Sequence, residues 1–315
     1  MLNIVFMGTP EFAVPSLDIL NRNHNVAAVV TAPDKPAGRG RKTQQSAVKK
    51  YAESQQITCL QPAKLKDPEF INALKNINPD LIVVVAFRML PEVIWKLPPK
   101  GTINLHASLL PQYRGAAPIN HAIINGETKT GVTTFFINDK IDTGKILFQE
   151  TVNISKSDNA GTLHDKLMEK GAKLIRQTVN AIEKNDIRPW VQQTPANIKP
   201  APKLFKKDCR INWQNKGKDV VNLIRGLSPY PTAWSKLKLK KHTIGMKIFD
   251  AEFFYSEHKF KPGTIHNTNN NNMDVAVADG FVRLNKIQPE NKKPMSAQAF
   301  LQGYDMSESE FLSTE

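Results

Sequence analysis

The stretch Leu81-Ile82-Val83-Val84-Val85-Ala86 is apolar at every position, and four of its six residues are β-branched. A strand with one wet face alternates apolar and polar side chains, whereas a strand that is apolar on both faces is typical of a sheet covered by helices on each side. The run is also far shorter than the roughly 20 residues that a transmembrane helix needs. We therefore expect the core strand of a Rossmann-like, mostly parallel α/β sheet here.

Short β-branched runs alternate with helical periodicity through the first two-thirds of the 315-residue chain, which is typical of βαβ units. One long helix is expected from Thr162 to Glu183, with Thr162 and Asp165 as its capping pair. One face of this helix carries Leu167, Leu174, Thr178 and Ile182. The other strands expected in this sheet are Asn3 to Met7, Val26 to Thr31 and Thr102 to His106.

The segment from Ile187 to Pro202 contains four prolines, each of which removes a backbone donor and resists helix formation. Beyond it the pattern changes to short strands with turns rich in glycine and asparagine, which suits a small β-barrel of the OB type. We expect a catalytic domain over residues 1–188, a linker over 189–205 and an OB-like domain over 206–315. The elements expected in the last part are strands at Trp234 to Leu239, Gly245 to Phe253, Asp274 to Ala278 and Gly280 to Lys286, with a helix around Asp219 to Arg225.

The chain carries 43 Lys and Arg against 29 Asp and Glu, a formal net charge of +14. Such an excess favours a polyanionic partner, and it is densest from Lys203 to Lys261. The chain shows neither the basic leader of a secretory signal nor a membrane-length apolar run, so we expect a cytoplasmic protein with no membrane partner. Cys59 and Cys209 have no Cys or His at ligand spacing, so we expect neither a disulfide framework nor a metal site.

Two polar side chains lie at the end of the expected strand from Thr102 to His106. Ligands of an open parallel sheet bind beyond the carboxyl ends of its strands, and residues two apart on a strand point to the same side. Asn104 and His106 therefore place a carboxamide and an imidazole next to each other at this edge. Downstream, Asp142 lies between two strand-like runs, so we expect it on a tight turn that reaches the same crevice.

Other interpretations of these motifs are weaker. Asp142-Thr143-Gly144 matches half of an aspartic-protease site, but that chemistry needs a second such carboxylate, and the sequence holds no second copy. Gly8-Thr9-Pro10 after a first strand suggests a dinucleotide site, yet the remaining glycines of that fingerprint are missing. Taken singly, Asn104, His106 and Asp142 are each also compatible with a purely structural role.

Several motifs in register resemble the folate-dependent formyltransferase family. They are the run from Asn104 to Ile119, Asp142-Thr143-Gly144 and the opening Phe6-Met7-Gly8-Thr9-Pro10-Glu11-Phe12-Ala13. Further matches extend the resemblance along essentially the whole chain, at Pro33 to Gly40, Ile211 to Trp213, Ile224 to Pro231 and Met295 to Leu301. One motif alone would be weak evidence, whereas this many in order are strong evidence.

The resemblance implies a catalytic trio of Asn104, His106 and Asp142. Formyl transfer to an amine builds negative charge on the formyl oxygen, which a preplaced amide donor stabilises without a change of protonation. An imidazole oriented by a carboxylate can take the proton that the amine loses, or can share in stabilising the charge on the formyl oxygen. The resemblance therefore implies an enzyme that moves the formyl group of 10-formyltetrahydrofolate to the α-amino group of initiator methionyl-tRNA, with no metal.

The same resemblance implies the binding residues. The folate site is expected along Ser108, Leu109, Leu110 and Pro111, with ordinary packing as the alternative for the two leucines. The loop around Arg39 resembles the family's insertion into the tRNA acceptor stem, with a plain basic loop as the alternative. The expected tRNA contacts are Arg39, Arg41, Lys42, Lys203 and Lys206. The protein is expected to act as a monomer.

Two rival functions share some of these features. Another formyltransferase of this fold, acting on glycinamide ribonucleotide or an amino sugar, or a formyl-folate hydrolase, would explain the trio but not the basic C-terminal part. A non-catalytic RNA-binding module would explain the charge but not the intact trio. The chain also departs from the family at two positions. Arg88 stands where a glycine is usual and either touches the folate's carboxylate tail or points outward, and Asn212 replaces an aspartate.

Overall fold

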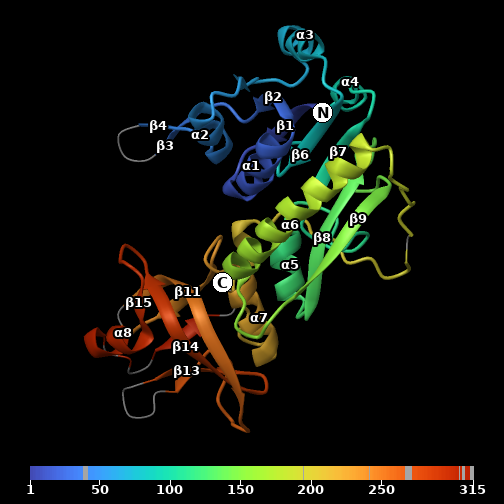
Figure 1. Ribbon diagram of the computed structural model, residues 1–315. Coiled ribbons are helices and arrows are strands. Elements are labelled where there is room, and N and C mark those ends of the chain that lie inside the picture. Colours follow the sequence, from blue (N-terminus) through green and yellow to red (C-terminus); the bar gives the residue numbers. More distant parts are fainter. Residues whose placement is uncertain are drawn as a thin grey trace. The chain divides into compact units, whose positions relative to one another are not determined.

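The computed structural model describes residues 1–37, 42–193, 195–240, 242–266, 272–304, 306 and 309–312. The fold divides into two compact units, each with its own sheet (Figure 1). The first unit comprises residues 1–115, 129–153 and 164–201, and the second comprises 116–128, 154–163 and 202–315. Two short stretches within residues 1–188 thus group with the C-terminal part of the chain.

Seven strands form the sheet of the first unit, in the order β5-β2-β1-β6-β7-β8-β9. All neighbours from β5 to β7 are parallel, and β8 pairs antiparallel with both β7 and β9. The strands are β1 (Asn3–Gly8), β2 (Asn25–Val30), β5 (Cys59–Leu60), β6 (Leu81–Val85), β7 (Thr102–His106), β8 (Lys129–Phe136) and β9 (Ile146–Asn153). The expected Rossmann-like, mostly parallel sheet is confirmed.

β6 lies between β1 and β7, and every one of its five residues is buried. Ala86, which the sequence placed in this strand, lies beyond its end with a positive φ of 49°. The helices of the first unit are η1 (Glu11–Ala13), α1 (Val14–Asn23), α2 (Ala47–Ser54), α3 (Pro68–Ile77), α4 (Glu92–Trp95) and most of α6 (Ala160–Glu183). A separate hairpin pairs β3 (Lys35–Ala37) with β4 (Lys42–Gln44).

The long helix α6 confirms its expected buried face, because Leu167, Leu174, Thr178 and Ile182 are all buried. Its expected cap is wrong. The helix begins at Ala160, so Thr162 lies in its first turn, and the Asn159 Oδ1 accepts the Thr162 N–H at 3.0 Å as the capping contact. Asp165 instead contacts the Nδ1 of His164 at 2.9 Å.

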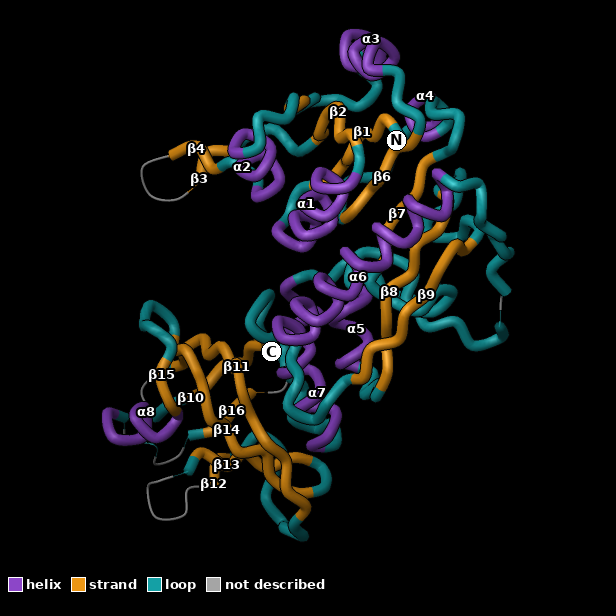
Figure 2. The backbone as a smooth tube through the Cα atoms, viewed as in Figure 1, coloured by secondary structure: helices purple, strands orange, loops and turns teal. Residues whose placement is uncertain are grey.

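The second unit is built on an antiparallel sheet in the order β12-β13-β14-β11-β10-β16, drawn in orange in Figure 2. An isolated bridge between Thr264 and Glu310, and a hydrogen bond from the Phe311 N–H to the Gly263 oxygen, join the β12 end of this order to β16. This closure fits the expected OB-like barrel. The strands are β10 (Ala233–Lys238), β11 (Thr243–Tyr255), β12 (Ile265–His266), β13 (Met273–Val277), β14 (Gly280–Pro289), β15 (Met295–Ser296), which pairs with β14, and β16 (Glu310–Leu312).

Helices of the second unit are α5 (Pro118–Ile124), η2 (Lys206–Cys209), α7 (Gly217–Leu227) and α8 (Ala297–Gly303). α5 and α7 pack tightly. A Cβ at Gly226 would lie 2.5 Å from the Ile124 side chain, and the Asn120 amide donates to the Gly226 oxygen at 2.7 Å. These contacts explain why residues 116–128 group with the C-terminal part. No helix in the described part of the chain is long and apolar enough to cross a membrane.

Candidate active site

The last residues of β7 present Asn104 and His106 on one side of the sheet. Side chains alternate along a strand, so Leu105 points the other way. Leu105 packs against α6, where a Cβ at Gly171 would lie 2.6 Å from its Cδ2 atom. Asn104 and His106 therefore lie on the sheet face opposite α6, at the carboxyl end of β7, as the sequence predicts.

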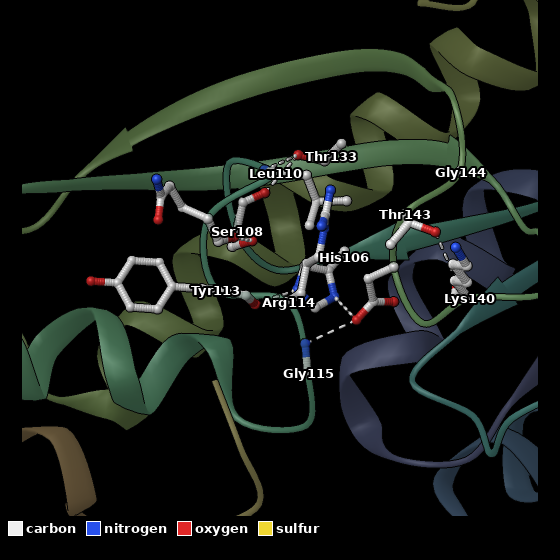
Figure 3. Close-up of polar contacts among 12 residues, drawn as sticks. His106, Ser108, Leu110, Tyr113, Arg114, Gly115, Thr133, Lys140, Thr143 and Gly144 are labelled. Atoms are coloured by element: carbon white, nitrogen blue, oxygen red, sulfur yellow. Dashed lines mark hydrogen bonds and ion pairs between the residues drawn. The ribbon is translucent and has the colours of Figure 1, made fainter. Parts of the chain in front are cut away.

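Both ring nitrogens of His106 face oxygen atoms. Its Nε2 lies 2.8 Å from the carbonyl oxygen of Tyr113 (Figure 3). Its Nδ1 lies 3.7 Å from Oδ2 of Asp142. A carbonyl oxygen can only accept, so Nε2 carries a proton in this geometry. The side chain is 93% buried, which keeps water away from both contacts. The ring is thus oriented by a backbone group close in sequence, and the carboxylate is a charge at ion-pair range beyond hydrogen-bond distance.

Asp142 lies on the turn between β8 and β9, with a positive φ of 53°. Aspartate tolerates this left-handed conformation better than most residues. The Oδ2 atom that faces His106 also accepts the Gly115 N–H at 3.0 Å. Two positions later, a Cβ at Gly144 would lie 1.6 Å from the Phe136 oxygen, so only glycine fits there. The expected tight turn is present, and it brings the carboxylate of Asp142 to His106.

Asn104 is half-buried, and among the described residues no group hydrogen-bonds its carboxamide. Its strand partners are Val84 on β6 and Phe135 on β8. A carboxamide without a protein partner retains both of its N–H donors for a ligand. This is the property that an oxyanion donor needs.

The loop after β7 is held by β8 and β9. The Thr133 hydroxyl donates to the Ser108 oxygen at 2.6 Å and accepts the Leu110 N–H at 3.2 Å, while the Gln149 amide donates to the Leu110 oxygen at 2.8 Å. Ser108 is fully buried, and Leu110 packs in a cluster with core side chains. Among the four residues predicted to line the folate site, only Leu109 and Pro111 keep partly exposed side chains.

Sequence reasoning missed one buried side chain, Gln192. Its exposed fraction is 6%, and its amide hydrogen-bonds the backbone of the Asp142 turn and the side chain of Arg114. It lies in the proline-rich stretch predicted to be a linker, where no periodic pattern marks a buried residue. Tyr113 and Gly115, which contact His106 and Asp142 through backbone atoms, lie inside the motif that was recognised, but a backbone role leaves no signal in residue type.

The two departures from the family pattern have structural partners. Arg88 is exposed, and its guanidinium donates to the carbonyl oxygens of Pro62 and Ala63. The N–H donors of Arg88 therefore bond to a neighbouring loop, which fits the alternative that this side chain points outward. Asn212 Oδ1 accepts the Gln214 N–H at 3.1 Å, while the adjacent Trp213 is fully buried. Asn212 thus makes a local turn contact that needs no charge.

The predicted tRNA contacts are spread over both units. Arg39 and Arg41 lie outside the described residues, and Lys42 is the first residue of β4, where its backbone pairs with Ala37 of β3. Lys203 and Lys206 are exposed, and their ammonium groups lie 5.6 Å and 5.5 Å from the ring centroids of Phe205 and Trp234. The flat rings orient these two cations while leaving them accessible.

An ion pair ties the base of the β3–β4 hairpin to α2. The Lys49 ammonium lies 2.6 Å from Asp34, whose other oxygen accepts from the Gln61 amide at 2.8 Å. The hydrogen bond from Lys49 holds the pKa of Asp34 below its ordinary value. No group of three or more His, Cys, Asp or Glu able to hold a metal ion occurs within the described ranges.

Known proteins resemble the chain at three levels. A sequence model of the family described as Formyl transferase matches residues 2–179, and one described as Formyl transferase, C-terminal domain, matches residues 203–305. The Methionyl-tRNA formyltransferase of Bacteroides thetaiotaomicron is 50% identical over 312 residues, covering 98% of this chain and 97% of that protein. The Methionyl-tRNA formyltransferase of Flavobacterium johnsoniae is 49% identical over 308 residues, covering 98% of each chain.

Two solved structures share the fold at low identity. HypX from Aquifex aeolicus in complex with tetrahydrofolic acid is 19% identical with a TM-score of 0.62, over 95% of this chain and 47% of that one, so the chain spans about half its length. The sugar 3N-formyl transferase WlaRD is 21% identical with a TM-score of 0.62, over 93% and 99% of the two chains. With its fold, its site and both matched regions in agreement, the chain belongs to the formyl transferase family.

Proposed function

We propose that this chain transfers the formyl group of 10-formyltetrahydrofolate to the free α-amino group of initiator methionyl-tRNA. The observation that carries the proposal is the arrangement at the end of β7. There a carboxamide with no hydrogen-bond partner among the described residues lies on the same strand face as a buried imidazole that faces a partly buried carboxylate. Relatives half identical over nearly the whole length carry the name of this activity.

Asn104 and His106 divide the chemistry between them. The amine nitrogen forms a bond to the formyl carbon, and negative charge grows on the formyl oxygen. The free N–H groups of Asn104 stabilise that charge. The bond from the formyl carbon to N10 of the folate then breaks, so one proton must leave the amine and one must reach N10. The products are the formylated amine and tetrahydrofolate, and no external oxidant or reductant enters.

His106 can move that proton through one nitrogen in particular. Because Nε2–H is committed to the Tyr113 oxygen, the lone pair of the neutral ring is on Nδ1, on the Asp142 side. Uptake of a proton there creates an imidazolium opposite a carboxylate. Asp142, which Gly115 holds in place, stabilises this cation, and His106 then returns the proton to the leaving nitrogen.

Among the residues after β7, some support the loop and others can contact a folate. The Ser108 oxygen and both backbone groups of Leu110 already bond to Thr133 and Gln149, so they hold the loop in place. Leu109 and Pro111 keep side-chain surface for the apolar face of a pterin. We therefore narrow the direct folate contacts among the four predicted residues to Leu109 and Pro111.

The second unit supplies the charge that a tRNA requires. From Lys203 to Lys261 there are 14 Lys and Arg against 5 Asp and Glu. Lys203 and Lys206 are presented on aromatic rings, and together with Lys42 and the two predicted arginines at 39 and 41 they are the proposed phosphate contacts. A small amino sugar offers no such row of phosphates.

We propose that the protein works as a cytoplasmic monomer, in which residues 1–188 are catalytic, residues 189–205 connect the two parts and residues 206–315 bind tRNA.

A formyl-transfer assay with competing acceptors tests the function. Purified protein and radiolabelled 10-formyltetrahydrofolate are incubated with methionyl-initiator tRNA, uncharged initiator tRNA, glycinamide ribonucleotide or an amino-sugar nucleotide. Label is expected only on the charged tRNA. Label on either small acceptor at comparable rates would favour a different formyltransferase, and tRNA binding without transfer would favour a non-catalytic module.

A further inference from the structure

The side chain of Gln192 makes every hydrogen bond that a carboxamide can make. Its Nε2 donates to the backbone carbonyl oxygen of Asp142 at 2.9 Å and to the backbone carbonyl oxygen of Gly144 at 2.8 Å. Its Oε1 accepts from the Arg114 Nε at 3.2 Å and Nη2 at 2.6 Å. A carboxamide has two N–H donors and one oxygen with two lone pairs, so all of its capacity is used. Glutamate would keep the acceptors and lose the donors, and leucine would lose both.

These four bonds link the groups that surround His106. Asp142 sits at a positive φ, and the backbone conformation of its turn sets where its carboxylate points. Arg114 lies between Tyr113, whose oxygen contacts His106 Nε2, and Gly115, whose N–H contacts the Asp142 carboxylate. Through one buried side chain, Gln192 thus fixes the Asp142 turn and the loop that carries both backbone contacts.

The chain around Gln192 is itself attached to the first unit. Trp190 exchanges two backbone hydrogen bonds with Ile146 at the start of β9, and the Ala201 N–H donates to the Arg114 oxygen at 2.8 Å. A Cβ at Gly115 would lie 2.4 Å from the Ala201 oxygen, so the two segments are in close contact. The segment that carries Gln192 is therefore attached to the first unit on both sides of this residue.

We propose that Gln192 is a positioning residue for formyl transfer, which holds the Asp142 carboxylate at His106. The proposal rests on the proposed function, because its kinetic effect is defined for that reaction. Gln192 touches neither of the reacting groups assigned above. Its removal is expected to leave both substrates bound and to misplace the carboxylate, and a misplacement of about 1 Å can cost on the order of a hundredfold in rate.

The test compares Gln192→Glu and Gln192→Leu with Gln193→Glu and Gln193→Leu. Gln193 is the same residue type at the next position, and it is exposed. Both Gln192 variants should lower kcat by about 10-fold to 100-fold while the KM for tRNA and folate stays within about twofold. Both Gln193 variants should match the unsubstituted protein. Equal kcat losses at positions 192 and 193, or a rise in KM without loss of kcat, would overturn the proposal.

A double-variant comparison separates positioning from a general loss of structure. If Gln192 acts through Asp142, adding Gln192→Leu to Asp142→Asn should lower kcat little further, whereas independent effects would multiply. The hydrogen-exchange rate of the Gly115 N–H reports on the position of the Asp142 carboxylate and does not depend on whether the protein transfers formyl groups. It should be at least about tenfold faster in the Gln192 variants and unchanged in the Gln193 variants, since this N–H donates to Asp142. An unchanged exchange rate in all four variants would refute the positioning role. Faster exchange in the Gln192 variants, combined with no formyl transfer by the unsubstituted protein, would refute only the proposed function.

Discussion

Replacing Asp142 by asparagine separates the charge of this side chain from its hydrogen bond. Asparagine keeps an oxygen for the Gly115 N–H and tolerates the positive φ of 53°, so the turn should persist. The charge opposite His106 is lost. Two unit charges 3.7 Å apart interact by about 4.5 kcal/mol at an effective dielectric constant near 20. If the imidazole carries half a positive charge in the transition state, the loss is about 2 kcal/mol. The expected fall in kcat therefore lies between about 30-fold and 2,000-fold.

The assay is single-turnover and steady-state formyl transfer to methionyl-initiator tRNA at saturating folate. KM for both substrates should stay within about twofold, because the charge acts on the transition state. Asp139→Asn is the matched control, since Asp139 is an exposed aspartate on the same turn. A loss of kcat below threefold for Asp142→Asn, or an equal loss for Asp139→Asn, would refute the electrostatic role given to Asp142.

Three further outcomes are expected. Asn104→Ala should lower kcat by about 100-fold to 1,000-fold, because it removes an oxyanion donor, and its thermal unfolding midpoint should stay close to that of the parent protein. A loss of activity below fivefold would contradict the role assigned to Asn104. Replacing Lys203 and Lys206 by glutamine should reduce the slope of log affinity for tRNA against log salt concentration by about two, and an unchanged slope would remove both from the interface. Lys49 holds the pKa of Asp34 below its ordinary value of 3.8, so the stability from this pair is present above that pH and is lost as pH falls below it. Lys49→Met should therefore flatten the acid side of the urea-midpoint profile, and an identical profile would count against the pair.

The sequence predicted the sheet because hydrophobic patterning is local. β6 is buried on both faces, as its uninterrupted apolar run indicates, and β7 has the bounds expected from Thr102 to His106. The predicted start of α6, at Thr162, was wrong. The start of a helix depends on which residue first departs from helical backbone geometry, and hydrophobic patterning does not reveal that residue. Asn159 and Thr162 share the capping role, and Asp165 does not. The grouping of α5 with α7 was also missed, since the fit of Gly226 against Ile124 joins segments about a hundred residues apart.

The candidate site shows the same division. Asn104 and His106 are adjacent on a strand face by the two-residue period alone, so their proximity follows from the sequence. The loop from Ser108 to Pro111, which we propose contacts the folate, shows the opposite case. Which of its residues keep free surface depends on Thr133 and Gln149, whose side chains bond to Ser108 and Leu110 from other strands. No periodicity reports such contacts.

By itself, the sequence predicted a two-part chain and determined a mostly parallel sheet, the residue types at the strand ends and, through several motifs in order, the family. These features follow from local backbone preference, alternation of buried faces and residue identity. Only the tertiary structure decided that the Tyr113 carbonyl orients His106, and that Gln192, 50 residues beyond Asp142, supports its turn. Hydrogen bonds at long separation depend on how loops meet once the sheet has formed, and a loop has no repeating pattern from which that meeting can be predicted.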